Sequence, residues 1–263
     1  MGIYITGPAL GGISALALTN SIAMPAMEEN WRHVLFLYAG ISFAIGVIWL
    51  VLASHPTAAR LQGIVAANSS QRQTVVFLDL LKLPAVRLTL IMAVGAFFFN
   101  HGLNNWLPEI LRRSGMTASQ AGFWAAIPTA IGVASSLLIP RFATPERRHT
   151  ILMALVFGAG LATFLLQFSE HHVPLTLGLV LQGITRGSIM TVMMLSLVET
   201  TGVGSRHAGI AGGMFFSAAE IGGILGPLTL GGLSDLTGGF SAGLNLLSGI
   251  CLLMVLLSLR LRR

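Results

Sequence analysis

The sequence predicts an all-α polytopic membrane protein, and three observations lead to that class. Of the 263 residues, 54% are hydrophobic and only 9% are charged, whereas soluble domains carry about 25% charged residues. A globule of this length still needs a polar surface, so a large core does not account for so few charges. The apolar residues form long runs, and 31 glycines suit the close approach of membrane helices.

Eight apolar runs are long enough to cross a bilayer, which takes roughly 20 residues. None shows the alternation over about ten residues that marks a barrel strand, so we expect eight helices. The connections are short except for residues 54–85, where "TVVFLDLLKLPAVR" has the pattern of an amphipathic surface helix. The eight expected spans cover residues 3–25, 33–53, 86–107, 118–139, 150–168, 173–197, 208–232 and 241–259.

The basic residues predict the orientation of these spans. With the N-terminus in the cytoplasm, eleven Arg and Lys residues fall inside and three outside, which is a strong positive-inside bias. The net charge of +6 therefore reflects topology, and we expect lipid and not nucleic acid as the partner. The inside set is Arg60, Arg72, Lys82, Arg87, Arg141, Arg147, Arg148, Arg206, Arg260, Arg262 and Arg263, and the outside set is Arg32, Arg112 and Arg113.

The first and seventh spans share a Gly-Pro pair followed by a Gly-Gly pair. Glycine faces permit tight helix packing, and a proline inside a membrane helix frees a carbonyl and allows a bend. Two copies six spans apart indicate a duplicated six-helix unit. The copies are Gly7, Pro8, Gly11 and Gly12, and Gly226, Pro227, Gly231 and Gly232.

These features together resemble the major facilitator superfamily. "TGPALGG" followed by "WRHVLF" resembles that family's fifth helix leading into its sixth, and "PRFATPERR" at 140–148 resembles its basic loop between helices eight and nine. The stretch "NHGLNNWLPEILRRSGMTASQAG" is most similar to the cyanate-transporter-like branch, near the nitrate/nitrite porters. The resemblance covers nearly the whole chain.

The resemblance implies a secondary transporter that lacks the first four of twelve helices. Residues 1–53 then hold two helices of the N-terminal bundle, 54–85 a cytoplasmic loop between the bundles, and 86–263 the C-terminal six-helix bundle. We expect an inner (plasma) membrane protein of a bacterium or archaeon with both termini cytoplasmic. The open alternative is a non-transporting remnant, or a subunit of a split transporter that needs a four-helix partner.

Arg186 is the one basic residue expected inside a span, where arginine costs at least about 2.5–3.5 kcal/mol. Glu220 lies as far from the turn at Val203 as Arg186 does, so we expect the two to pair. In one interpretation this ion pair only fixes helix packing. In the other, Arg186 and nearby Gln182 bind a small anionic solute, and Glu220 releases it or carries a coupling proton.

The third span carries four hydrogen-bonding side chains within "FFFNHGLNNW". Asn100 and Asn104 share one stripe of the helix and are the candidates for lining and gating a cavity. The alternative is hydrogen bonding between helices near the outer interface. His101 is, with Glu220, a coupling candidate, because histidine is a residue type that can take up and release a proton, although a lone histidine is more often a packing residue.

In the fourth span, Pro128 is expected to kink the helix, with the Thr129 hydroxyl bonding back to the backbone. The sequence holds no HExxH motif, no paired aspartates within spans and no facing Ser and His, so we expect no enzyme. His171 and His172 have no nearby Cys or carboxylate cluster, so we expect neither a metal site nor a cofactor.

Overall fold

The computed structural model describes residue 11, residues 18–56 and residues 73–261, and within these ranges it holds helices and turns with no strand. Seven described helices are long and apolar enough to cross a membrane, which confirms the all-α membrane architecture. The first expected span, 3–25, lies mostly outside the described residues. Gly7, Pro8 and Gly12 also lie outside them. The chain divides into two compact units, Met1–Arg72 and Gln73–Arg263.

The first unit consists of a short helical entry and one long helix. A π-helical turn, η1 (Thr19–Ala23), leads into α2 (Met24–Ala26), and α3 covers Trp31–Ala53. The Asn30 side chain caps α3 by accepting a hydrogen bond from the backbone N–H of Arg32 at 3.0 Å. Val34 is buried, whereas most other apolar side chains of α3 are exposed.

The second unit holds one short helix and six long ones. Their limits lie within a few residues of the expected spans, except that α6 and α10 extend about one to two turns further. The elements are α5 (Gln73–Lys82), α6 (Pro84–Arg113), α7 (Ala118–Phe142), α8 (Arg148–Leu165) with the 3-10 turn η2 (Leu166–Phe168), α9 (His172–Val198), α10 (Gly204–Thr237) and α11 (Ser241–Leu261).

Local sequence signals set the helix ends. Pro84 occupies the first turn of α6, where its missing N–H costs no hydrogen bond. Thr117 and Gln120 form a reciprocal capping box at the start of α7. Gly238 follows α10 with a φ of 76°, a left-handed conformation that favours glycine, and so ends the helix.

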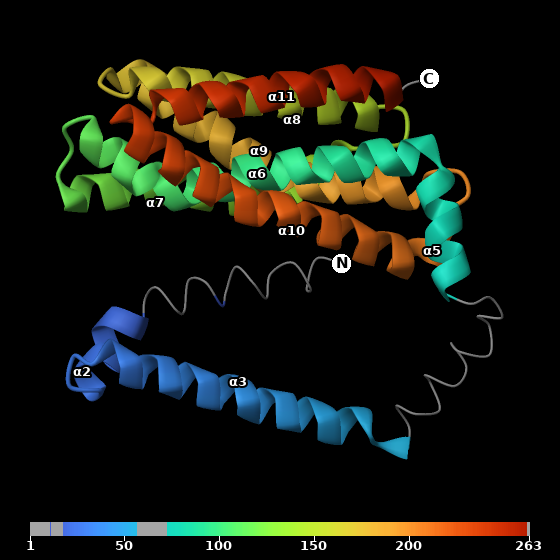
Figure 1. Cartoon of the computed structure of the whole chain (residues 1–263), viewed down its shortest axis with the longest axis horizontal. Coiled ribbons are helices and arrows are strands. Elements are labelled where there is room, and N and C mark those ends of the chain that lie inside the picture. The colour runs from blue at the N-terminus through green and yellow to red at the C-terminus, as the bar shows by residue number, and fades with distance from the viewer. Residues whose placement is uncertain (1–10, 12–17, 57–72, 262–263) are drawn as a thin grey trace. The chain divides into compact units, whose positions relative to one another are not determined.

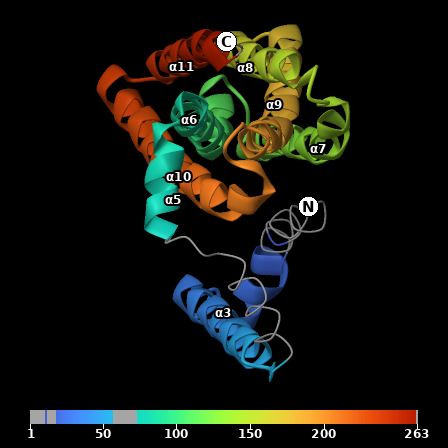
Figure 2. The same cartoon turned by 90° about the vertical axis from the view of Figure 1, so that its right-hand side faces the viewer.

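The six long helices pack in a closed arrangement that can be followed end-on in Figure 2. α10 lies along α6, α6 also contacts α7 and α11, α11 packs on α8, and α9 packs on both α7 and α8. Most of the buried side chains between them are apolar, with Phe99 of α6 and Phe215 of α10 among the largest, and a minority are polar. This arrangement decides which polar side chains can meet inside the bundle.

The predicted amphipathic segment forms α5, which lies across the long helices at one end of the second unit (Figure 1). Val76 and Leu80 are buried on its inner side, where α5 packs on α6 and α10. Its exposed side carries an ion pair between Lys82 and Asp79, 2.8 Å apart. Val75, Phe77 and Leu78 are exposed as well, so α5 carries apolar side chains beyond its inner face.

The contact between α6 and α10 depends on glycine. A Cβ atom on Gly222 would collide with the carbonyl of Val94, and one on Gly226 would collide with the carbonyl of Phe98. The backbones of Gly102 and Gly226 also face each other. Glycines four residues apart are the usual basis of close helix crossings in membranes.

Candidate functional site

Arg186 lies in the middle of α9, and its Nη1 donates a hydrogen bond to the Thr129 hydroxyl of α7 at 3.0 Å. The arginine side chain is partly buried. From the sequence, the Thr129 hydroxyl was expected to bond back to its own helix. Instead it accepts from Arg186, so α7 supplies a neutral partner to a charge in the middle of a membrane span.

Close packing of α7 and α9 brings these two side chains together. A Cβ on Gly183 would lie 2.8 Å from the carbonyl of Pro128, and one on Gly187 would collide with the carbonyl of Gly132. The Ser135 hydroxyl of α7 lies 3.1 Å from the carbonyl of Ile184 and links the two backbones. Small residues before and after Arg186 therefore let α7 come near enough for Thr129 to reach it.

Arg186 and Glu220 form no ion pair in the described part of the chain, contrary to the expectation from the sequence. The reason is the helix arrangement. Equal distance from a turn places two residues at similar depth, but α9 packs chiefly on α7 and α8 while α10 packs chiefly on α6. Helices that are consecutive in sequence are thus not the closest partners in space.

Gln182 precedes Arg186 by one helical turn, on the same face of α9. It is only 1% exposed, and its side-chain oxygen has no hydrogen-bond partner among the described residues. A buried amide oxygen without a partner costs about 1–3 kcal/mol. Such a group has an unused capacity to accept a hydrogen bond.

Glu220 of α10 and His101 of α6 both lie close to Gly223, where α10 contacts α6. A Cβ on Gly223 would lie 3.0 Å from Oε2 of Glu220 and 3.7 Å from Cδ2 of His101. The His101 ring also stacks on Phe97, with ring centroids 5.3 Å apart. The carboxylate and the imidazole thus share the space that the missing side chain of Gly223 leaves open.

Asn100 and Asn104 are partly buried on α6, one turn apart. Neither side chain makes a hydrogen bond within the ranges that the structure describes. No described contact joins them to Arg186. The candidate residues therefore form two groups, one on α7 and α9 and one on α6 and α10.

Three of the four residues in the second Gly-Pro copy, including Gly226, lie directly against α6. The indole N–H of Trp106 donates to the carbonyl of Pro227 at 2.9 Å. A Cβ on Gly231 would lie 2.7 Å from the same indole. Gly232, in contrast, is exposed with no atom near the position of a Cβ, so it contributes no packing within the described residues.

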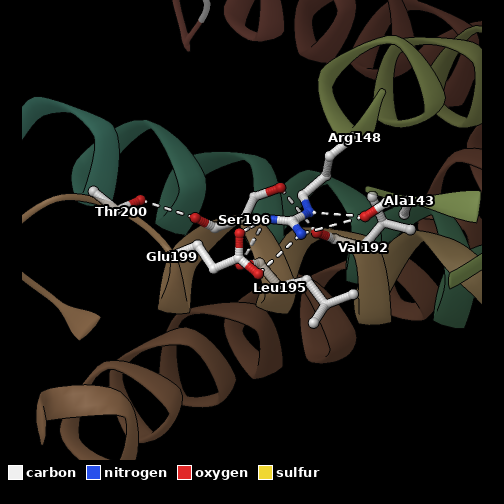
Figure 3. A network of polar contacts seen from close by, with 7 residues as sticks. All are labelled: Ala143, Arg148, Val192, Leu195, Ser196, Glu199 and Thr200. Atoms are coloured by element: carbon white, nitrogen blue, oxygen red, sulfur yellow. Dashed lines mark hydrogen bonds and ion pairs between the residues drawn. The ribbon is translucent and has the colours of Figure 1, made fainter. Parts of the chain in front are cut away.

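A second polar network, which the sequence did not indicate, lies where α8 begins and α9 ends (Figure 3). Nη1 and Nη2 of Arg148 donate to Oε2 and Oε1 of Glu199 at 2.5 and 3.0 Å. Arg148 also donates to the carbonyl of Ala143, at 3.3 Å from both Nε and Nη2. Together these bonds tie the loop after α7 to the end of α9.

Arg148 is buried whereas Glu199 remains about half exposed, and the two charges compensate each other. The hydrogen bond from Arg148 holds the pKa of the Glu199 carboxyl below its ordinary value of 4.5. From the sequence, Arg148 was counted only toward the positive-inside bias. Arg148 begins α8 and Glu199 directly follows α9, so both lie at the same end of this helical hairpin, and that position is the signal that could have revealed the pair.

Within the described ranges, no three His, Cys, Asp or Glu side chains gather as metal ligands would. The fold is thus a polytopic helical bundle with polar groups between its helices, an architecture in which solute pathways are common. Residues 1–166 match the sequence profile of the Major Facilitator Superfamily, and the chain belongs to that family of membrane transport proteins.

Three relatives are named as transporters. A protein of Agrobacterium vitis named "Putative tartrate transporter" is 26% identical over 89% of this chain and 55% of its own length. YycB, an uncharacterized transporter of Bacillus subtilis, is 24% identical over 90% of this chain and 58% of its own. A quinolone resistance transporter of Acinetobacter baumannii is 27% identical over 60% of this chain and 36% of its own. The chain thus spans about half the length of the first two.

Proposed function

We propose that the protein is a secondary active transporter, or the larger part of one, and that it moves a small anion by alternating access. One observation carries the proposal: Arg186 lies within a membrane span, and its described partner is a neutral hydroxyl. A cation at that depth costs at least about 2.5–3.5 kcal/mol. A transported anion would supply the missing counter-charge during each cycle.

The guanidinium suits a planar oxyanion, because its fork donates two parallel hydrogen bonds. In this scheme Thr129 orients the fork and leaves its other N–H groups for the solute. The unpartnered oxygen of Gln182 would accept a hydrogen bond from a donor on the same solute. The A. vitis relative is named for tartrate, an organic anion, which agrees with this choice of solute class.

Glu220 and His101 are the proposed coupling groups. Both side chains lie near the position of a Gly223 Cβ, and both residue types can carry a proton within a membrane span, which supports a role in coupling. Asn100 and Asn104, whose side chains are without described partners, would line the path on α6 and gate it. Residues 86–263 would then form one of the two bundles that rock about the site.

The positive-inside bias supports cytoplasmic termini in a bacterial or archaeal inner membrane. In that orientation Arg148 and Glu199 lie on the cytoplasmic side, and the turns after α6, η2 and α10 lie outside.

Uptake into proteoliposomes tests the proposal. The purified chain would be assayed with labelled inorganic and organic anions, beside Arg186→Gln, Arg186→Lys and the matched control Arg87→Gln, which changes an exposed arginine at the start of α6. We expect Arg186→Gln to abolish uptake, Arg186→Lys to reduce it, and Arg87→Gln to retain it. Full uptake by Arg186→Gln with unchanged helicity would contradict the role of Arg186.

A further inference from the structure

A separate cavity of about 700 Å³ opens at the end of the second unit that holds the α6–α7 and α10–α11 turns. The end of α6, the turn before α9, the end of α10 and the start of α11 form its walls. Small-molecule sites commonly enclose about 300–1,000 Å³. The cavity is thus large enough for a polyatomic group and is distant in sequence from Arg186.

Charges of both signs line this cavity without neutralising each other. Arg113 contributes a guanidinium, and Glu170 and Asp235 contribute carboxylates. Neither carboxylate forms an ion pair with Arg113 or with another described residue. Opposite charges that share a cavity but do not meet leave room between them for a ligand that carries both charges.

The cationic wall is held rigidly in place. Nη1 of Arg113 donates to the buried Ser234 hydroxyl at 3.1 Å and to the carbonyl of Gly238 at 3.3 Å. Its Nε donates to Glu109, and its guanidinium lies over the Phe240 ring at 5.0 Å. Nη2 takes part in none of these hydrogen bonds, so it remains available to an anionic group.

The lining also offers three acceptors to a cation, from Ser169, Glu170 and Asp235. Ser169 is 8% exposed, lines the cavity, and its hydroxyl makes no hydrogen bond within the described part of the chain. With the carboxylates of Glu170 and Asp235 it matches the three N–H donors of a primary ammonium. A quaternary ammonium has no such donors and would leave these acceptors unsatisfied.

The depth of the cavity indicates where its ligand comes from. The membrane spans that form it end at Arg113, Phe168 and Thr237, which is the level of the lipid headgroups. Leu236, beside Asp235, is 85% exposed, so apolar surface adjoins the polar opening. A lipid headgroup whose glycerol end faces this apolar surface would fit both the polar opening and the apolar surface beside it.

We propose that this cavity binds a phosphoethanolamine group, with its phosphate at Arg113 and its ammonium at Glu170, Asp235 and Ser169. The group is the headgroup of phosphatidylethanolamine, and the same chemistry exists as free phosphoethanolamine. The site is independent of the anion site proposed above, since it shares no residue with it.

Lipid retention distinguishes the sources. The full chain would be extracted from bilayers of phosphatidylethanolamine, phosphatidylglycerol and phosphatidylcholine in equal parts, and retained lipids counted by native mass spectrometry. We expect about tenfold enrichment of phosphatidylethanolamine over phosphatidylcholine, equivalent to about 1.4 kcal/mol. In a second arm, free phosphoethanolamine is added to the chain in phosphatidylcholine nanodiscs, and a rise in the unfolding midpoint without lipid preference would identify the soluble source.

The variants keep the proposal falsifiable. Glu170→Gln with Asp235→Asn removes both carboxylates with little change in shape, and Ser169→Ala removes the hydroxyl. Glu146→Gln, at an exposed position between α7 and α8, is the matched control. The double variant should lose the preference for phosphatidylethanolamine, or the shift of the unfolding midpoint, and the control should retain it. Absence of both effects in the wild type, or an unchanged preference in the double variant, would overturn it.

Discussion

The Arg186 guanidinium and the Arg148 guanidinium are held in opposite ways. Arg148 is satisfied by a bidentate carboxylate and by backbone carbonyls, so its charge is compensated within the protein. Arg186 has one described bond, to a neutral hydroxyl. A compensated arginine stabilises a structure, whereas an uncompensated one in a membrane span indicates function.

Thr129→Val tests whether the hydroxyl positions Arg186. The variant loses one hydrogen bond to a charged group. A loss of about 1.4 kcal/mol in binding free energy would raise the apparent KM for the anion about tenfold. Thr129→Ser keeps the hydroxyl and should restore the KM, which separates positioning from packing. Uptake kinetics in proteoliposomes provide the measurement, and equal KM values for Thr129→Val and wild type would argue against the positioning role.

The ion pair of Arg148 and Glu199 predicts a dependence of stability on pH. Because the folded pKa of Glu199 is lowered, its stabilisation is fully present above the ordinary value of 4.5 and is lost as pH falls through the lower, folded value. Glu199→Gln should therefore lower the unfolding midpoint at neutral pH. Because the carboxylate is about half exposed, we expect the free energy of unfolding to fall by about 1 kcal/mol. The difference between variant and wild type should shrink in acid, as thermal unfolding in detergent at several pH values would reveal.

Between helices, the glycines of α10 set how closely α6 can approach. Gly226→Ala would place a methyl group 3.0 Å from the backbone nitrogen of Gly102 and closer still to a carbonyl. Neither backbone neighbour can rotate away. We expect a loss of about 1–3 kcal/mol, seen as a lower unfolding midpoint.

Gly232→Ala is the matched control on the same helix. Its new methyl group would meet no atom within 4 Å, and alanine favours helix over glycine by about 1 kcal/mol. Its unfolding midpoint should be unchanged or raised. A similar loss in both variants would mean that helix flexibility, and not close packing, explains the glycines.

Span positions could be predicted from the sequence because they depend on local composition. The apolar run of 150–168, for example, appears as α8 and η2 within two residues of its expected start. The partner of Arg186 could not be predicted, since it depends on which helices are neighbours. Equal distance from a turn does not identify a partner for Arg186 in Glu220, because α9 and α10 scarcely pack together, whereas α8 and α9 do pack together and bring Arg148 to Glu199 at their shared end. The cavity at Arg113 combines the ends of four helices, so no local pattern reveals it.

Cysteine labelling can test the expected orientation of the whole molecule in the membrane. In a Cys251→Ala background, which removes the single native cysteine, we expect His171→Cys to react in intact cells with a thiol reagent that does not cross membranes. Glu146→Cys, at the opposite end of α8, should react only after the cells are opened. The reverse pattern of labelling would place both termini outside.

Trp106 gives this protein an optical property of its own. Its indole packs directly against Gly231, and its N–H donates a hydrogen bond to the Pro227 carbonyl. The surroundings of the indole therefore change whenever α10 slides or tilts against α6. Replacing Trp31, Trp49 and Trp124 with Phe would leave one fluorophore at this contact. Its emission would shift to longer wavelength as water enters, and the opening of the bundle could then be timed without an attached dye.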